Sequence, residues 1–451
     1  MTNPAQLTMS DAIPAAEPDA VAASPLVMGR RRTVVLLMLA FIYSLNYFDR
    51  QIVVILQEPI KADFKLADWE LGLLTGGAFG IFYTLMGIPI AQVIDRGVNR
   101  VRLIALFTAS WSIMTALCGL ARSFGTFFTA RMGVGLAEAG FAPAAHSLIA
   151  DFYPPRERPA AVGIFAIGVP VGIMAGLAIG GIVAQATDWR TALLIAGLPG
   201  ILIAILFPLI AREPLRGIND HPSLRASGTE APMGFFQSVR VLMKRRAFFH
   251  LVCGTAIMTF SQMGFMNWLP SFLIRSGGMS LADVGISLGL LTGICGAIGT
   301  WLGGWQGTRL SGSGLHMALR VPIAGMILSA PLTIAALSMF DGLTLLLVLV
   351  PTYILNSLWT APAIALVQSL APVSMRARAS AVNIVAANLV GISLGPLVAG
   401  ILSDLFAYLR GGDAILGLRD SLMCLALFSL WGAWHWTLAT RALRRETTPP
   451  V

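Results

Sequence analysis

Four ionisable residues lie inside long apolar runs of the chain, and they are the residues best placed to do chemistry. Asp49 and Arg50 are neighbours in one run, whereas Arg131 and Glu138 lie seven residues apart in another. A charged side chain inside an apolar span is costly, so each one predicts a function and a partner. Burial favours the neutral form of a carboxylate, and a nearby guanidinium favours the charged form. We therefore expect Asp49 and Glu138 to carry protons and the two arginines to act as movable charge partners.

The two arginines have a second use open to them. A guanidinium binds phosphate or carboxylate through paired hydrogen bonds, so Arg50 or Arg131 could hold the anionic headgroup of a substrate. A helix rises about 1.5 Å per residue, which places Glu138 roughly 10 Å deeper in the membrane than Asp49 and the arginines. The alternative interpretation is a permanent ion-pair cluster that only fixes helix packing.

The apolar runs that carry these residues dominate the composition. The chain has 451 residues, of which 56% are hydrophobic and 12% are charged, with a mean hydropathy of +0.77. Soluble domains carry about 25% charged residues, so a cytosolic enzyme is excluded. Twelve runs, the fourth at 126–150, are each long enough to cross a hydrocarbon core about 30 Å thick. The sequence predicts an all-α membrane protein with twelve transmembrane helices.

An internal repeat divides the twelve runs into two sets of six. Leu-Ala-Asp at 66–68 recurs at 281–283, Gly-Leu-Leu-Thr-Gly at 72–76 recurs at 289–293, and later matches are 219 to 220 residues apart. Two such repeats predict bundles that rock against each other, with the substrate site between them near the middle of the membrane. The expected segments are a disordered cytoplasmic tail at 1–29, an N-terminal six-helix bundle at 30–212, a cytoplasmic linker at 213–245, a C-terminal six-helix bundle at 246–440 and a cytoplasmic tail at 441–451.

The repeat offset also compares the two halves. It places the counterpart of Asp49 at Gly264 and that of Glu138 at about Ser357, so the second half lacks both acids. The seventh and tenth runs offer neutral polar side chains instead. A cavity that is charged on one wall and apolar on the other suits an amphiphile. The expected cavity-lining residues are Asn46, Tyr47, Ser261, Gln262, Asn267, Tyr353, Asn356 and Trp359.

The loop after the second run carries a charged motif. Residues 91–100 read Ala-Gln-Val-Ile-Asp-Arg-Gly-Val-Asn-Arg, which resembles the cytoplasmic signature of the major facilitator superfamily, with Ala91 where that family usually has glycine. A carboxylate at a helix end can latch a neighbouring helix terminus and release it during rocking. We therefore expect Asp95, Arg96 and Arg100 to form a cytoplasmic gate; the alternative is a solvated turn.

The end of the first run is the most specific segment. Asn46-Tyr47-x-Asp49-Arg50, together with the acidic fourth run, resembles the spinster family of lipid transporters within that superfamily, over about residues 30–440. The resemblance implies proton-linked movement of lysophospholipids or sphingosine-phosphate-like lipids, with the matching carboxylates in the first and fourth runs as coupling groups. The expected function is a proton-coupled lipid transporter that works by alternating access.

Two other functions stay open at this point. One is a proton symporter for a small organic anion such as a sugar acid, and the other is a lipid-binding or sensor protein that transports nothing. A hydrolase is set aside because both Gly-x-Ser-x-Gly matches, at 285–289 and 391–395, lie within apolar helical runs, whereas the motif requires a strand-turn-helix elbow with acid and histidine partners. The chain is not expected to be an enzyme, and no cofactor or metal site is expected.

The basic residues predict the orientation. With the termini inside, 22 of the 31 arginines and lysines fall in cytoplasmic segments, as the positive-inside rule requires. The same rule explains the net charge of +9 without a nucleic-acid partner. We expect a monomer in the inner or plasma membrane, with both termini cytoplasmic.

Overall fold

The structure is a computed structural model, and it describes residues 25–216, 235–312, 314–339, 342–372 and 375–447. These residues fold into helices joined by short turns. A helix satisfies its backbone N–H and C=O groups within its own segment, which an apolar bilayer requires. The prediction of an all-helical membrane fold is confirmed.

The first half of the chain contains ten helices and one π-helical turn among the described residues. They are α1 (Pro25–Ile55), α2 (Gln57–Phe64), α3 (Asp68–Gly72), η1 (Leu73–Gly77), α4 (Ala78–Asp95), α5 (Arg100–Leu120), α6 (Phe124–Glu138), α7 (Phe141–Phe152), α8 (Arg158–Ala166), α9 (Gly168–Ala186) and α10 (Trp189–Ile210).

The second half follows the same plan after a short helix, α12 (Phe235–Lys244). Its elements are α13 (Arg246–Gly277), α14 (Leu281–Leu290), η2 (Leu291–Cys295), α15 (Gly296–Ser311), η3 (Leu315–Met317), α16 (Arg320–Leu337), α17 (Gly342–Ser357), α18 (Thr360–Ser369), α19 (Arg376–Ala386), η5 (Ala387–Leu394), α20 (Gly395–Leu409) and α21 (Ala414–Thr447).

Eleven helical segments of the described residues are long and apolar enough to cross a membrane. The run predicted as a single fourth helix at 126–150 is divided instead, because α6 ends at Glu138 and α7 begins at Phe141. The turn residues Ala139 and Gly140 keep right-handed helical backbone angles, so the break between α6 and α7 is local. The carboxylate of Glu138 therefore stands at a helix end in the protein interior.

The same break recurs in the second half. There α17 ends at Ser357 and α18 begins at Thr360, so the turn at 358–359 follows the turn at 139–140 by 219 residues. This spacing equals the offset found in the sequence repeat. The duplication is therefore visible in the backbone as well as in the residues.

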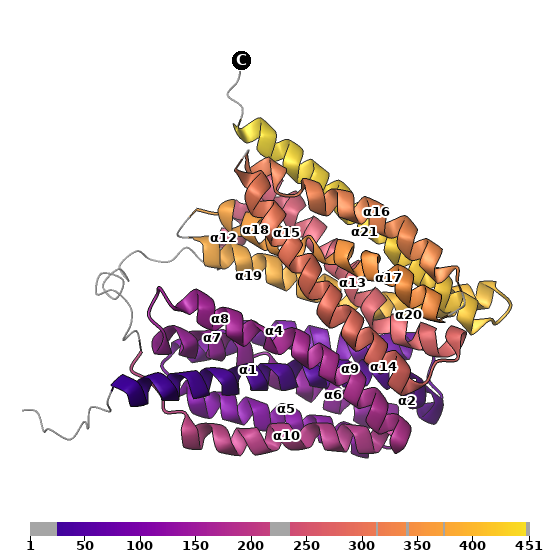
Figure 1. The fold of residues 1–451 in the computed structure, drawn as a ribbon, viewed down its shortest axis with the longest axis horizontal. Helices are drawn as coiled ribbons and strands as arrows, with labels where there is room; N and C mark the ends of the chain where they lie inside the picture. Colours follow the sequence, from indigo (N-terminus) through magenta and orange to yellow (C-terminus); the bar gives the residue numbers. More distant parts are fainter. Residues whose placement is uncertain (1–24, 217–234, 313, 340–341, 373–374, 448–451) are drawn as a thin grey trace, which may run out of the picture.

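The buried apolar side chains form three clusters. Two of them belong to one half each, and the third is shared by both halves. One cluster is built on first-half residues such as Phe165 and another on second-half residues such as Leu251. Both lie toward the end of the molecule where α1 begins and α21 ends, which we call the terminal face. The halves diverge toward this face in Figure 1, where the first half is indigo to magenta and the second is orange to yellow.

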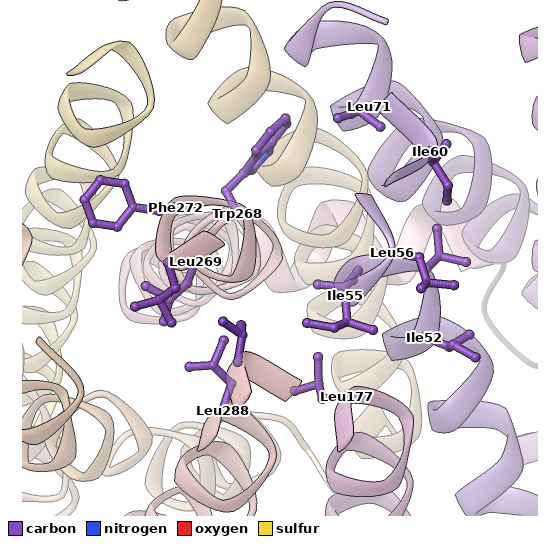
Figure 2. Packing of buried hydrophobic residues seen from close by; sticks show 14 of the residues in the cluster. Ile52, Ile55, Leu56, Ile60, Leu71, Leu177, Trp268, Leu269, Phe272 and Leu288 are labelled. Carbon is purple, nitrogen blue, oxygen red and sulfur yellow. The ribbon is translucent and has the colours of Figure 1, made fainter. Parts of the chain in front are cut away.

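The third cluster is shared by both halves. Ile55 and Leu177 of the first half pack with Trp268 and Leu288 of the second (Figure 2). This cluster lies toward the opposite end, where α1 and α13 end, which we call the far face. The two bundles are therefore in close apolar contact at the far face.

The predicted tails are shorter than expected. The tail predicted at 1–29 overlaps α1, which begins at Pro25, and residues 1–24 lie outside the described residues. At the other end α21 continues to Thr447 because Leu443 is buried against the second-half core. Most of the tail predicted at 441–451 is therefore helical.

The predicted linker also contains regular structure. Within 213–245, α12 packs Leu242 into the second-half core, and its buried Ser238 accepts a hydrogen bond of 2.9 Å from Arg378. An apolar face at helical spacing drives this docking. Residues 217–234 of the predicted linker lie outside the described part of the chain.

Candidate functional site

Helices α1 and α6 bring an arginine and a glutamate into direct contact. The Nε atom of Arg50 donates to Oε2 of Glu138 over 2.7 Å, although the residues are 88 positions apart. The Glu138 side chain has no exposed surface and that of Arg50 is 13% exposed. The predicted depth difference of about 10 Å between these residues gave no indication of this contact, which the long side chains of Arg50 and Glu138 make.

Three aromatic rings enclose the same guanidinium. The Cζ atom of Arg50 lies 4.7 Å from the ring centroids of Tyr47, Phe79 and Tyr83. These distances are within the roughly 6 Å over which a cation is attracted to a ring face. Sequence reasoning missed Phe79 and Tyr83, because aromatic residues in an apolar run give no signal of what they face. Arg50 is thus held by one carboxylate and three rings.

Asp49 is placed differently from Glu138. It is 2% exposed, and Nη1 of Arg131 donates to its backbone carbonyl oxygen over 3.4 Å rather than to its carboxylate. Among the described residues, Asp49 takes part in no salt bridge and its Oδ1 atom has no hydrogen-bond partner. The two predicted proton carriers therefore differ, since only Glu138 is paired with a cation.

A cavity of about 150 Å³ lies where the two halves meet beside this cluster. Its first-half wall carries Arg50 and Arg131 together with Tyr47, Gln51 and Thr75. Its second-half wall is mostly apolar and is formed by Met263, Met266, Asn267, Ile392 and Pro396. The cavity therefore has the asymmetry predicted from the sequence, charged on one side and largely apolar on the other.

A second, smaller cavity of about 30 Å³ lies inside the second half and shares Met266 with the first. Four of the predicted cavity residues line it, namely Ser261, Gln262, Tyr353 and Asn356. Sequence reasoning missed the further hydroxyl groups of Ser329, Thr333, Thr352 and Ser429. The second half therefore offers a neutral polar chamber beside the cavity between the halves.

The other predicted cavity residues have mixed positions. Tyr47 and Asn267 line the cavity between the halves, and Asn267 also accepts hydrogen bonds from Gln57 and Thr75 at 2.5 and 2.9 Å. Asn46 is buried at 1% exposure within the first half. Trp359 instead lies in the second-half core, 5.6 Å from Trp436 between ring centroids.

The predicted cytoplasmic gate is only partly described. Arg100 is buried and pairs with Asp151 at 2.6 Å and with Glu213 at 2.7 Å, both on the first-half side. Arg96 is exposed, and the side chain of Asp95 lies outside the described residues. In this conformation Arg100 holds the start of the linker to its own bundle.

A charged network at the far face joins the two halves. Arg275 of α13 pairs with Asp68 at 2.7 Å and with Glu58 at 2.8 Å, while Ser403 donates to Asp68 over 2.6 Å. Lys61 completes the set by pairing with Asp68. Sequence reasoning missed this network, because these residues lie at the ends of runs where a charge is ordinary.

Known proteins resemble the chain over most of its length. A Mycolicibacterium smegmatis protein named "MFS-type efflux pump" is 34% identical over 410 residues, which are 90% of this chain and 92% of that protein. Human "Protein spinster homolog 1" is 27% identical over 393 residues, or 83% and 73% of the two chains. Drosophila melanogaster "Protein spinster" is 26% identical over 411 residues, 87% of this chain, and the match spans 65% of the fly protein.

Solved structures and a family model agree with these relatives. The crystal structure of a bacterial homolog to the human lysosomal transporter spinster, inward-facing and unoccupied, superposes with a TM-score of 0.85 at 30% identity, over 95% of this chain and 100% of that one. The model described as Major Facilitator Superfamily matches residues 39–396. The chain is a spinster-family transporter of the Major Facilitator Superfamily.

The spinster assignment confirms the resemblance predicted from the segment at 46–50. A second structure of the bacterial spinster homolog, inward-facing and occupied, gives a TM-score of 0.81 at 29% identity, over 93% of this chain and 99% of that one. This spinster-family chain is therefore a membrane-embedded transporter rather than an enzyme. The charged cluster of α1 and α6 lies beside the cavity between its two halves.

Proposed function

We propose that this spinster-family transporter moves a lysophospholipid or a sphingosine-phosphate-like lipid across the membrane, coupled to protons. The observation that carries this proposal is the cavity between the halves, with Arg50 and Arg131 on one wall and Met263 and Met266 on the other. Guanidinium groups bind phosphate in a forked geometry. Methionine side chains adapt to irregular apolar surfaces such as an acyl chain.

The size of the cavity limits what it holds in this conformation. Sites that enclose a drug-sized ligand measure about 300 to 1,000 Å³, whereas this cavity measures about 150 Å³. It therefore accommodates a headgroup, and the acyl chain extends beyond it along the apolar second-half wall.

Proton coupling follows from the different surroundings of the two acids. Glu138 forms a salt bridge with Arg50, whereas the Asp49 carboxylate forms none among the described residues, although Arg131 contacts the Asp49 backbone. A buried carboxyl group without a cation is best accommodated in its neutral form. Movement of Arg50 or Arg131 between the acids, or toward an incoming phosphate, would then switch proton uptake and release.

The conformation described here corresponds to one state of alternating access. The shared core and the ion network close the far face, as in an inward-facing transporter with cytoplasmic termini in the cell membrane. The distribution of basic residues supports the same orientation. The protein acts as a monomer, because the site is formed within one chain.

Two other substrates remain as outcomes of the test. The name of the Mycolicibacterium smegmatis relative, "MFS-type efflux pump", favours efflux as a second function, which we test with an amphiphilic dye. The neutral polar side chains around the second-half cavity, such as Ser261 and Asn356, are of the kind that binds a hydroxyl-rich substrate such as a sugar acid, but their cavity of about 30 Å³ would have to widen to admit one. Both substrates would still use the first-half arginines.

The test is transport in proteoliposomes under an imposed pH gradient, with a fluorescent lysophospholipid, a labelled sugar acid and an amphiphilic dye. We expect flux of the lysophospholipid, and weaker flux of a monoacylglycerol that lacks the phosphate. The variant Arg131→Gln should remove this preference for phosphate. Flux of the sugar acid or of the dye alone would replace the proposed substrate, and lipid binding without flux would indicate a sensor.

A further inference from the structure

The far face contains a short motif that occurs once in each half. Residues 181–185 read Gly-Ile-Val-Ala-Gln near the end of α9, and residues 400–404 read Gly-Ile-Leu-Ser-Asp in α20. The two segments are 219 residues apart, the offset of the internal repeat. In both, one helical turn separates a glycine from a side chain that accepts hydrogen bonds. The duplication has therefore kept the same pair of features at equivalent places.

The second-half copy of the motif holds the beginning of a first-half helix. Oδ1 and Oδ2 of Asp404 accept hydrogen bonds from the backbone N–H groups of Asp68 at 3.1 Å and Trp69 at 2.8 Å. These N–H groups begin α3 and have no partner within that helix. Gly400 lies against the Asp68 carbonyl oxygen, where a Cβ would collide. The glycine admits the helix start, and Asp404 caps it.

The first-half copy of the motif does the same for a second-half helix. Oε1 of Gln185 accepts a hydrogen bond of 2.9 Å from the backbone N–H of Ala282, at the beginning of α14. Gly181 lies against the Leu281 carbonyl oxygen, where a Cβ would also collide. The helix starts at 66–68 and 281–283 are themselves one of the sequence repeats. Each half therefore caps the equivalent helix of the other.

We propose that Gln185 and Asp404 are a duplicated pair of caps that hold the far face closed. Opening this face separates α9 from α14 and α20 from α3, so both caps must break. The ion network of Asp68 and Arg275 lies on one of these two contacts, the α3 and α20 side. A cross-half cap is therefore present at both contacts, α9 with α14 and α20 with α3, whereas the ion network is present at one.

Both capped helices also have caps from their own half, which provide matched controls. Ser280 accepts a hydrogen bond of 3.2 Å from the Asp283 N–H in α14, and Glu70 accepts one of 2.8 Å from the Ala67 N–H before α3. Loss of an own-half cap weakens the helix end equally in the closed and open states. Loss of a cross-half cap weakens only the closed state.

The experiment measures opening of the far face directly. Double electron–electron resonance between two spin labels reports the distance between the halves. One label replaces Arg122, which is exposed on the first half, and the other replaces Tyr408, which is 82% exposed on the second. The four native cysteines are replaced by alanine in this background. The variants are Gln185→Ala, Asp404→Ala, their combination, and the control Ser280→Ala.

We expect each cross-half variant to raise the population with a long distance by about two- to tenfold, since a hydrogen bond contributes about 0.5 to 1.5 kcal/mol net. The double variant should multiply the two effects, and Ser280→Ala should match the parent. Asp404→Asn keeps one of the two acceptor oxygens, so it should keep one of the two hydrogen bonds and open the face less than Asp404→Ala. Gly181→Ala, which forces α9 from α14, should open the face by a different route.

Three results would overturn the proposal. The first is parent-like distances in both Gln185→Ala and Asp404→Ala. The second is a shift in Ser280→Ala as large as in these two variants. The third is opening in Asp404→Asn as large as in Asp404→Ala, which would assign the effect to charge rather than capping. If Asp404→Ala does not fold, the comparison of Gln185→Ala with Ser280→Ala still decides the question. The measurement needs no substrate, so it stands or fails separately from the proposed lipid transport.

Discussion

The two halves of the molecule share a backbone plan and differ in their chemistry. In the first half, the break after Glu138 lies beside the caged guanidinium of Arg50. In the second half, the break after Ser357 lies beside a close helix contact, since a Cβ on Gly299 would stand 2.7 Å from the Ser357 Cβ. The duplicated element therefore carries ionisable groups in one half and tight packing in the other.

None of the four charged residues has a charged counterpart in the second half. By the repeat offsets, the residues Asp49, Arg50, Arg131 and Glu138 correspond to Gly264, Phe265, Val350 and Ser357. A buried charge needs a partner in apolar surroundings, so a half without one member of the set has no use for the others. The first half therefore carries the ionisable groups that we propose for proton coupling, while the second half carries a neutral wall.

The largest effect is expected from removing Glu138, an acid whose counterpart in the second half is Ser357. Glu138→Gln keeps the shape of the side chain but replaces an ionic hydrogen bond, which contributes about 1.5 to 3 kcal/mol, with a neutral one. The acceleration of lipid flux by a pH gradient should fall about tenfold or more in proteoliposomes.

A surface acid provides the control for this variant. Glu157 pairs with Arg32 at 2.9 Å, but both side chains are well exposed, at 48% and 35%. Glu157→Gln should therefore leave pH-driven flux close to that of the parent. Equal losses in the two variants would show that the buried position of Glu138 is irrelevant.

The next effect tests the packing role of the second half. A Cβ on Gly264 would stand 2.8 Å from Leu425 Cδ1 and 2.9 Å from the Gly395 carbonyl oxygen. Overpacking of this kind costs about 1 to 3 kcal/mol, so Gly264→Ala should lower the thermal unfolding midpoint in detergent. Gly304→Ala is the matched control, because its Cβ would stand 3.4 Å from Ala361 Cβ; an equal shift in both would contradict the packing account.

A smaller effect is expected from changing the caged cation. Arg50→Lys keeps the positive charge but loses the flat guanidinium that the three rings enclose. A cation near a ring contributes about 0.5 to 2 kcal/mol, so lipid flux should fall about fivefold. Tyr83→Phe keeps the ring and should have little effect; flux in Arg50→Lys equal to the parent would leave the cage without a role.

The smallest effects should be equal in the two halves, because both cap their last long helix with an aspartate. Asp188 accepts hydrogen bonds from Arg190 and Thr191 at the start of α10, and Asp413 accepts them from Ile415 and Leu416 at the start of α21. Replacing either with alanine should cost about 1 kcal/mol of unfolding free energy. Unequal costs would show that the halves differ in helix capping as well.

The first of these caps also has a predicted pH dependence. Hydrogen bonds from Thr191, first from its backbone N–H, lower the pKa of Asp188 below its ordinary 3.8. The cap therefore contributes its full stability above that ordinary value and loses it as the pH falls through the lowered folded pKa. The difference between the parent and Asp188→Ala should shrink in acid, whereas Asp188→Asn should show no such change.

The fold and part of the site were predictable from the sequence. Apolar runs and repeated motifs predict the helices and their duplication, and buried charges identify Asp49, Arg50, Arg131 and Glu138. The ion pair between Arg50 and Glu138 was not predictable, because it depends on how α1 and α6 are rotated and on the helix break. Phe79, Tyr83 and the caps at 185 and 404 were missed for the same reason, since only the packed backbone brings them to their partners.

The most direct test of the central claim is to follow protons while lipid moves. Proteoliposomes with a trapped pH dye and no imposed gradient receive a lysophospholipid, and the lumenal pH is recorded together with lipid flux. The account predicts a pH change that tracks lipid flux in the parent and disappears in Asp49→Asn. Lipid flux at the parent rate without any pH change, or an unaltered pH change in Asp49→Asn, would contradict it.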